Sequence, residues 1–228
     1  MKEKIVERVA ELFCPPQGIA PTGGEQMKTG NKYPDAKEID LAKHVDGTTT
    51  YALDAVYGEG LCKFGVLDVD QRDAAGLKAA MDMREYLESS GVNCLLSFSG
   101  SKGYHVTVFS EAVPKEVMAG ALKKVRARFE FKGEVIPGDA QRCKPAPCLH
   151  QVAGNMSYYF QDEPYGEEFG PDSLPAGFYE HQLEILEQVK PTPANVLIVF
   201  ASTEDKKEHQ GSLEDMIPNF SKAKDELT

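Results

Sequence analysis

Apolar side chains follow a helical period close to the N-terminus. Within residues 2–13 they recur at Ile5, Val6, Val9, Leu12 and Phe13. Cys14, Pro15 and Pro16 come next, so we expect a helix that ends at this point. Residues 15–36 contain several Gly and Pro together with Thr and Asn, and they predict a long loop. Loops of this length are usually functional or mobile.

The middle of the chain changes to a strand pattern. Residues 47–56 are rich in β-branched and aromatic types, and residues 64–70 form an apolar run that ends in carboxylates. Residues 73–89 return to helical spacing and are followed by Gly91. Residues 92–99 and 104–109 then predict two strands joined by the turn Gly100–Gly103, which is a hairpin.

The rest of the chain alternates between both patterns. We expect a basic helix at about 114–130, a short strand at 134–136, a Pro-rich connector through Pro147, a strand at 155–160, a helix near 176–189 and a strand at 195–201. Hairpins mixed with helices indicate an α+β fold with a largely antiparallel sheet. We expect one domain over 1–202, with a helix and long loop over 1–46 and the core over 47–202. Residues 203–228 predict a charged tail or linker.

Composition limits the class of protein. The 228 residues are 41% hydrophobic and 27% charged, as in a soluble globular protein. No window approaches the roughly 18 apolar residues of a membrane span, and the N-terminus lacks the apolar run of a signal peptide, so we expect a cytoplasmic protein without membrane partners. The net charge of −11 counts against a passive nucleic-acid coat protein, because affinity for phosphates comes mainly from clustered Lys and Arg.

Charge is nevertheless unevenly distributed. The segment from Lys115 to Lys132 carries six basic residues against Glu116 and Glu130. This pattern predicts either a local basic face for nucleic acid or an ordinary solvated helix face.

The five cysteines are scattered and odd in number, which favours reduced thiols. Cys143, Cys148 and His150 alone are close enough in sequence to suggest zinc. Their C-x4-C-x-H spacing fits no common structural zinc site and has no clear fourth ligand, so buried small hydrophobic residues are the plainer interpretation.

Candidate chemistry begins with Asp68 and Asp70 in LDVD. Alternation along a strand puts both side chains on one face, with Val69 on the other. Carboxylates held this closely repel each other unless a cation lies between them, and Mg²⁺ and Mn²⁺ prefer such oxygen ligands. D-x-D also occurs in sugar-nucleotide transferases, in phosphatases and at exposed strand ends.

The hairpin SGSKGYH, residues 99–105, offers a hydroxyl, a cation and an imidazole within a glycine-containing turn. Ser99, Lys102 and His105 could donate to phosphate oxygens, while Gly100 and Gly103 would allow close backbone approach. An ordinary hairpin turn with an incidental His is the alternative.

A third segment, residues 134–150, contains acids and cations in a connector constrained by proline. Glu134 or Asp139 would complete a site of three carboxylates, and Arg142, Lys144 and His150 could hold a triphosphate. The alternative is a solvated loop.

Together these three segments resemble the archaeo-eukaryotic primase (AEP) superfamily. In that family a D-x-D strand end, an S-G-x-x-G-x-H hairpin and a later acidic motif follow in this order, as LDVD, SGSKGYH and residues 134–150 do here. The third segment is also similar to a family stretch in which an acid precedes an Arg, a Pro and a Leu-His pair, here Arg142, Pro147, Leu149 and His150. KHVDGTTTYALDAV, residues 43–56, is similar to segments of primase-polymerases from CRISPR-associated and mobile-element conflict systems. The resemblance covers about residues 40–190.

The family's third acid does not map to a single position. The E-x-x-P form of EVIP favours Glu134, whereas the spacing back from the Leu-His pair favours Asp139. We prefer Glu134. The zinc-binding insertion of replicative primases is not visible in this sequence.

The resemblance implies an RRM-like, largely antiparallel sheet flanked by helices, and primase and DNA polymerase activity by two-metal catalysis. Asp68, Asp70 and the third acid would hold two Mg²⁺ or Mn²⁺ ions. Ser99, Lys102 and His105 would bind the phosphates of an incoming NTP or dNTP, assisted by Arg142, Lys144 and His150, and the basic helix could follow a single-stranded or primed template.

Three alternatives to a primase-polymerase stay open. They are a gap-filling repair polymerase of the same superfamily, a catalytically silent single-strand-binding module and a D-x-D glycosyltransferase. The glycosyltransferase would need parallel βαβ units, whereas this chain predicts hairpins. Other domains or proteins of a replication, repair or CRISPR system are possible partners.

Overall fold

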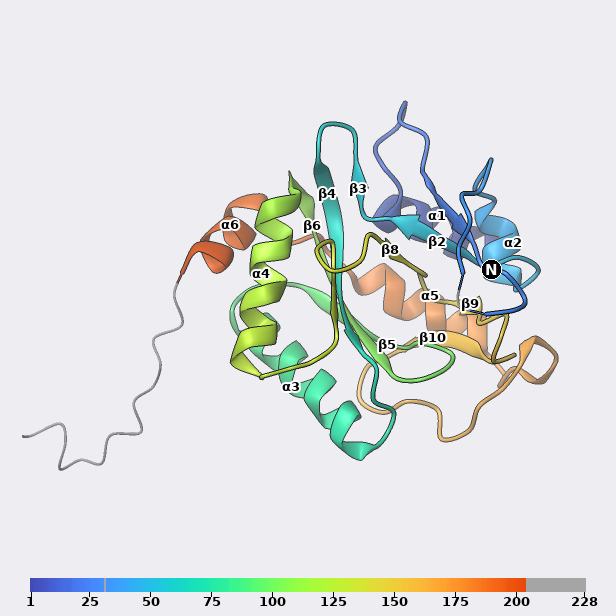
Figure 1. The fold of residues 1–228 in the computed structure, drawn as a ribbon. Coiled ribbons are helices and arrows are strands. Elements are labelled where there is room, and N and C mark those ends of the chain that lie inside the picture. Colours follow the sequence, from blue (N-terminus) through green and yellow to red (C-terminus); the bar gives the residue numbers. More distant parts are fainter. Residues whose placement is uncertain (31, 204–228) are drawn as a thin grey trace, which may run out of the picture.

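A curved sheet forms the centre of the protein, and helices pack on both of its faces (Figure 1). The computed structural model describes residues 1–30 and 32–203. The strands of this sheet lie in the order β3, β4, β6, β5, β10, β9, and β7 also pairs with β4. Their bounds are Val56–Tyr57 (β3), Leu61–Val69 (β4), Cys94–Phe98 (β5), Tyr104–Pro114 (β6), Glu134–Ile136 (β7), Cys148–Leu149 (β9) and Met156–Phe160 (β10). Every pairing between these strands is antiparallel.

A smaller sheet of three strands lies beside the large one, with β2 at its centre. Its strands are β1 (Gly23–Glu25), β2 (Tyr51–Asp54) and β8 (Arg142–Cys143). It brings the N-terminal region and the connector after β7 together, although about 90 residues separate β2 from β8 in the chain. The long loop expected over 15–36 therefore contains a short strand, and the strand expected over 47–56 is divided into β2 and β3 at Ala55.

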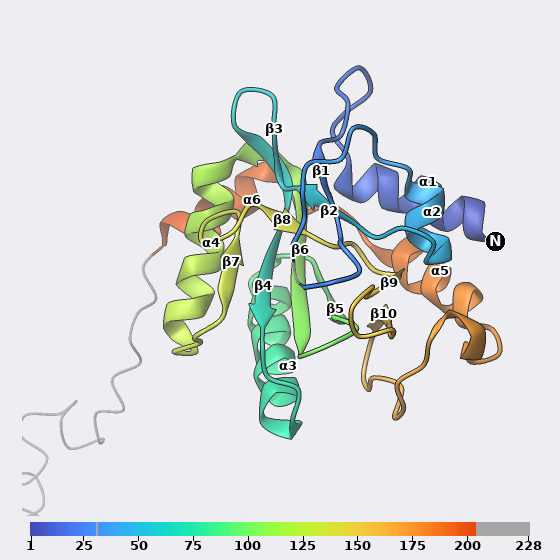
Figure 2. The ribbon, with the colours of Figure 1, turned by 45° about the vertical axis from the view of Figure 1, so that its right-hand side comes forward.

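The helices form two groups, one on each face of the large sheet (Figures 1 and 2). On one face lie α3 (Ala74–Ser89), α4 (Lys115–Arg128) and α6 (Ala194–Ser202); on the other lie α1 (Lys2–Phe13) and α5 (Phe178–Gln188), with the short α2 (Leu41–Asp46) against α1. A 3₁₀ turn, η1 (Pro171–Ser173), precedes α5.

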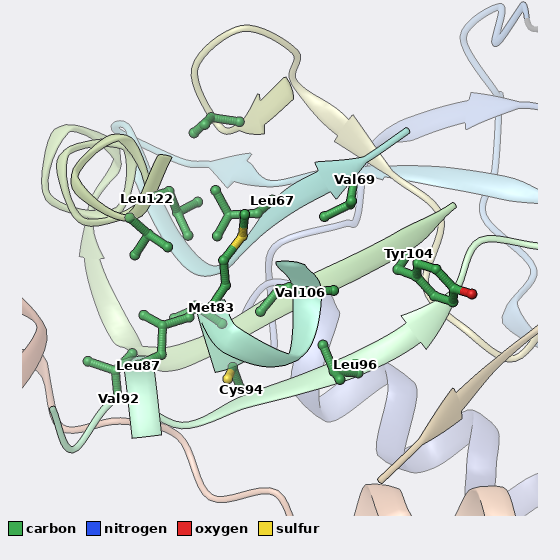
Figure 3. Close-up of a cluster of buried hydrophobic side chains, with 14 of the residues drawn as sticks. Leu67, Val69, Met83, Leu87, Val92, Cys94, Leu96, Tyr104, Val106 and Leu122 are labelled. Atoms are coloured by element: carbon green, nitrogen blue, oxygen red, sulfur yellow. The ribbon is translucent and has the colours of Figure 1, made fainter. Parts of the chain in front are cut away.

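Each face of the sheet has its own hydrophobic core. Met83 and Leu87 of α3 and Leu122 of α4 pack against Leu67 and Val106 (Figure 3). On the opposite face the side chains of Ile5, Phe13, Phe64, Val66 and Ile185 pack together. Burial on both faces explains why β4 has a continuous apolar run where a half-exposed strand would alternate.

The structure confirms the α+β class with a largely antiparallel sheet. The helices expected over 2–13, 73–89, 114–130 and 176–189 correspond to α1, α3, α4 and α5, and the expected hairpin of 92–99 and 104–109 corresponds to β5 and β6. The five cysteines are buried free thiols, as expected for Cys143 and Cys148.

The strand expected over 195–201 is wrong, because these residues form helix α6. Pro193 stands before the first turn, and the Glu111 carboxylate accepts a hydrogen bond from the Ala194 N–H. Burial follows a helical interval, since Leu197 and Phe200 are buried whereas Val199 is 59% exposed. A short apolar run does not distinguish a strand from a helix, so packing against α4 decided the outcome.

Two further expectations concern the chain as a whole. No helix in residues 1–30 or 32–203 has the length and apolar character needed to cross a bilayer. Of the tail expected over 203–228, all but Thr203 lies outside the described residues.

Candidate active site

The candidate site lies where the apolar face of β4 becomes acidic. Along β4 the side chains of Phe64 and Val66 enter the core shared with α1, and Asp68 continues the same alternation. Asp70 follows directly after the strand. Asp68 therefore extends from a buried strand, and Asp70 lies at its end.

Three neighbouring strands each contribute one side chain to a row of two carboxylates and one imidazole. The strands β7, β4 and β6 lie side by side (Figure 2). Asp68 on β4 is in register with Glu134 on β7 and with His105 on β6. Residues paired across antiparallel strands have Cβ atoms about 4.5–5.5 Å apart on the same face of the sheet. Glu134 and His105 thus lie on either side of Asp68, although 29 positions separate them in the sequence.

These side chains open into a pocket of about 360 Å³. Nine of the ten residues predicted for the site line it: Asp68, Asp70, Ser99, Lys102, His105, Glu134, Arg142, Lys144 and His150. It is also lined by Tyr33, Ala52, Ser101, Ile136 and Cys143, none of which was predicted as a residue of this site. The sequence held signals for three of them: Tyr33 lies in the long loop expected to be functional or mobile, Ser101 lies in the SGSKGYH hairpin, and Cys143 was considered only for zinc.

Asp139 is the predicted residue that the fold takes elsewhere. Its carboxylate pairs with the Arg126 guanidinium on α4 and accepts a hydrogen bond of 3.0 Å from the Val135 N–H. It closes the turn after β7 instead of lining the pocket. Between the two candidates for the third acid, the geometry favours Glu134.

His105 and Asp68 form an ion pair, with 3.4 Å between Nε2 and Oδ1. Burial alone would lower the pKa of His105, but the charge and hydrogen bond of Asp68 outweigh burial and raise this pKa to about 10. Burial would raise the pKa of Asp68, and His105 in turn holds it below its usual range. The pair is therefore imidazolium and carboxylate at neutral pH.

Two more basic groups of the pocket have lowered pKa values. Burial lowers the pKa of the Lys144 ammonium. Burial, and then the charge of Lys144, lower the pKa of His150 to about 4, so its imidazole is neutral at pH 7. The Ala153 N–H donates to His150 Nδ1 at 3.1 Å, which leaves Nε2–H as the donor that His150 can offer a ligand.

The glycine turn between β5 and β6 is held tightly against the protein. A Cβ atom on Gly103 would lie 1.8 Å from the carbonyl oxygen of Val69, and one on Gly100 would lie 3.0 Å from Cβ of His150. Ser99 Oγ accepts a hydrogen bond of 3.2 Å from the Gly103 N–H. These glycines let the turn approach the acidic strand and the His150 segment, and so bring Lys102 to the pocket.

The carboxylates have the donor chemistry for a hard divalent cation. Asp68, Asp70 and Glu134 present oxygens to one pocket, which is the ligand type that Mg²⁺ and Mn²⁺ prefer. Within the described part of the chain, no three His, Cys, Asp or Glu side chains are grouped closely enough to hold a metal ion. The side chains of Asp70 and Glu134 would therefore have to rotate to chelate one, and both are exposed.

The basic residues of α4 are largely engaged within the protein. Arg126 pairs with Asp139, Lys124 donates to the Phe200 carbonyl, and the Arg128 guanidinium lies over the Tyr86 ring. These contacts favour the structural interpretation of this segment over a template-binding face.

Comparisons with known proteins give no match to a family model and none to a curated protein. Among solved structures, the chain is similar to the polymerase domain of Mycobacterium tuberculosis Ligase D in complex with DNA, at 15% identity and a TM-score of 0.47, over 84% of this chain and 90% of that one. It is also similar to the AEP domain of the cyanophage S-2L primase-polymerase, at 15% identity and a TM-score of 0.48, over 82% of this chain and 98% of that one.

Proposed function

We propose that this protein is a template-dependent nucleotidyltransferase, a primase-polymerase that joins nucleoside triphosphates. The observation that carries the proposal is the row Glu134, Asp68 and His105 on three adjacent strands, in one pocket with Lys102 and Lys144. Carboxylates suited to hard cations and basic groups suited to phosphates thus face the same space. The resemblance of the three motifs to the AEP superfamily supports the same reaction class.

Each group would have a distinct role. Asp68, Asp70 and Glu134 would hold divalent ions. Bound there, Mg²⁺ or Mn²⁺ would lower the pKa of a primer 3′-hydroxyl and offset charge on the triphosphate. Lys102 and Lys144 would bind phosphate oxygens as point charges.

His105 is held in place by the carboxylate that it neighbours. Its Nε2 is directed to Asp68, and as an imidazolium it keeps positive charge beside the phosphates. His150, which is neutral, would contribute an N–H donor without a charge.

The test is incorporation of labelled ribonucleotides and deoxyribonucleotides on unprimed and primed single-stranded DNA, with Mg²⁺ or Mn²⁺. The wild type would be compared with the double variant Asp68→Ala, Asp70→Ala. A matched control is Asp82→Ala, Glu85→Ala, which removes two carboxylates from the surface of α3.

We expect synthesis by the wild type and the control, and none by the folded Asp68→Ala, Asp70→Ala variant. Products on the unprimed template would establish priming, whereas extension of primed templates alone would indicate a gap-filling polymerase. If no protein made product while wild type and variant bound single strands equally, the silent binding module would replace the enzyme.

A further inference from the structure

A hairpin-like arm from the N-terminal region reaches the pocket. We define the arm as residues 23–30 and 32–36, on either side of residue 31, which is not described. Its two sides pair through Glu25 N–H to Pro34 O at 3.0 Å, Met27 N–H to Lys32 O at 3.1 Å and Ala36 N–H to Gly23 O at 3.0 Å. Its inner side is β1, which pairs with β2, and residues 32–36 form its outer side. The arm is therefore an ordered part of the smaller sheet.

Arg142 joins this arm to the sheet. Its guanidinium donates to Asp54 Oδ1 on β2 at 2.6 Å, and on the arm to Asp35 Oδ1 at 2.6 Å and to the Tyr33 carbonyl at 2.9 Å. The hydrogen bonds to Asp54 and Asp35 raise the pKa of Arg142 further. We call this group of contacts the Arg142 clamp.

Gly24 leaves the space that the clamp occupies. A Cβ atom at this position would lie 2.5 Å from the Tyr33 carbonyl oxygen and 2.8 Å from Nη1 of Arg142. Cβ atoms do not approach other atoms this closely, so any larger residue at position 24 would displace the guanidinium or the arm. The close approach of strand, arm and guanidinium depends on this glycine.

The clamp changes the role expected of Arg142. Its donors are directed to the protein's own oxygens, and two carboxylates offset its charge. A triphosphate would have to displace Asp35 or Asp54 to bind this guanidinium. Lys102, Lys144 and His105 are therefore better placed as phosphate ligands.

Tyr33 is the residue that the clamp presents to the pocket. Its backbone is held by Arg142 and its half-buried side chain lines the pocket with Asp68. Burial raises its pKa, as do the neighbouring Cys148, Cys143 and Asp68, so the phenol stays neutral. Within the described residues its hydroxyl has no hydrogen-bond partner. An apolar ring with a neutral hydroxyl suits the nucleoside part of a ligand better than its phosphates.

We infer that Arg142 is a positioning residue that holds Tyr33 as a wall of the nucleotide pocket, and that Tyr33 contacts the sugar or base of the bound nucleotide. The inference rests on the proposed function for the identity of the ligand. The clamp itself can be tested without any activity.

The first measurement is amide hydrogen exchange of the free protein. Asp35→Asn and Arg142→Lys should speed exchange at the amides of Glu25, Met27 and Ala36, which close the arm. Asp82→Asn, which removes one side of the exposed Lys78–Asp82 pair on α3, is the matched control and should leave the arm unchanged. Unchanged exchange in both clamp variants would overturn the clamp, whether or not the protein is a polymerase.

The second measurement is the affinity for ATP and dATP analogues whose α–β phosphate bond cannot be cleaved. Titration calorimetry in the presence of Mg²⁺ gives this affinity. We expect Tyr33→Ala to weaken affinity about tenfold, and Asp35→Asn to weaken it in the same direction. The double variant should be no weaker than Tyr33→Ala alone, because both changes remove the same contact.

The direction in which Asp35→Asn changes nucleotide affinity shows whether Arg142 positions Tyr33 or binds phosphate itself. If Arg142 bound phosphate directly, freeing it from Asp35 would strengthen nucleotide affinity, and that result would overturn the inference. Unchanged nucleotide affinity in Tyr33→Ala would contradict the contact between Tyr33 and the bound nucleotide. Normal binding of both analogues without incorporation by the wild type would count against the polymerase alone.

Discussion

His105 on β6 and Asp68 on β4 stand opposite each other in the lining of the pocket, with 3.4 Å between Nε2 and Oδ1. Glu134 is in register with Asp68 on the other side of β4. One carboxylate thus lies between a cation and a second acid. This arrangement leads to predictions for stability, for the titration of His105 and for the identity of the third acid.

The pair should make stability depend on pH in a defined direction. The pKa of His105 is raised from 6.5 to about 10 on folding, so its stabilisation is complete below pH 6.5 and is lost as pH rises through about 10. We expect His105→Gln to lower the free energy of unfolding by about 2 kcal/mol near pH 6 and by much less near pH 10.5. Urea denaturation at both pH values measures this, and an equal loss at both would contradict the ion pair.

Removing the carboxylate should reverse the shift of His105. In Asp68→Asn the largest remaining influence is burial, which lowers the pKa of an imidazole and is opposed only by Cys143, so we expect the His105 pKa to fall well below about 10. An NMR titration of the imidazole resonances reports the value. Asp70→Asn is the matched control, and a drop of equal size there would show that Asp68 is not the specific partner.

Glu134 and Asp139 should differ in what they support. We expect Glu134→Gln to reduce nucleotide incorporation by at least about a hundredfold with little change in stability. Asp139→Asn should lower the free energy of unfolding by about 1 kcal/mol, because Arg126 and the Val135 N–H lose a charged acceptor and keep only a neutral amide oxygen, and should retain most activity. Primer extension measures the activity of both variants, and thermal denaturation measures their stability. Loss of activity in Asp139→Asn but not in Glu134→Gln would make Asp139 the third acid.

The glycine turn can be tested by adding one methyl group. Gly103→Ala would place Cβ against the Val69 carbonyl, so the turn must move away from β4, at a cost of more than about 2 kcal/mol and most of the activity. Gly166→Ala is the control, since a Cβ there meets no atom within 4 Å. Equal stability of the two variants would mean that the turn does not pack closely on β4.

Helix α6 makes a prediction that a strand would not. Leu197→Ala should cost about 2–4 kcal/mol, whereas Val199→Ala should cost less than about 0.5 kcal/mol, because Leu197 is buried and Val199 is 59% exposed. In a strand these two residues would share one face. Similar losses in the two variants would therefore contradict the helix.

Local patterns in the sequence correctly predicted many of the helices and strands. Apolar spacing located α1, α3, α4 and α5, and the glycine turn located the β5–β6 hairpin. For residues 195–201 the apolar content had no clear period and could not distinguish a strand from a helix. Contact with α4 and the hydrogen bond from the Ala194 N–H to Glu111 favour the helix. Spacing also could not show that α4 uses Arg126 and Lys124 for packing, since their partners are remote in the chain.

For the candidate site, the sequence alone supplied the residue types and the alternation that puts Asp68 and Asp70 on one face of a strand. Local geometry determines such features, because neighbouring residues define a strand or a tight turn. Only the tertiary structure decided that β7 pairs with β4, which brings Glu134 beside Asp68 and takes Asp139 to Arg126. It also directed Arg142 to Asp35 and Asp54 and placed Tyr33 in the pocket. Strand pairing and ion pairs between distant segments depend on how the whole chain packs, and no local pattern contains that information.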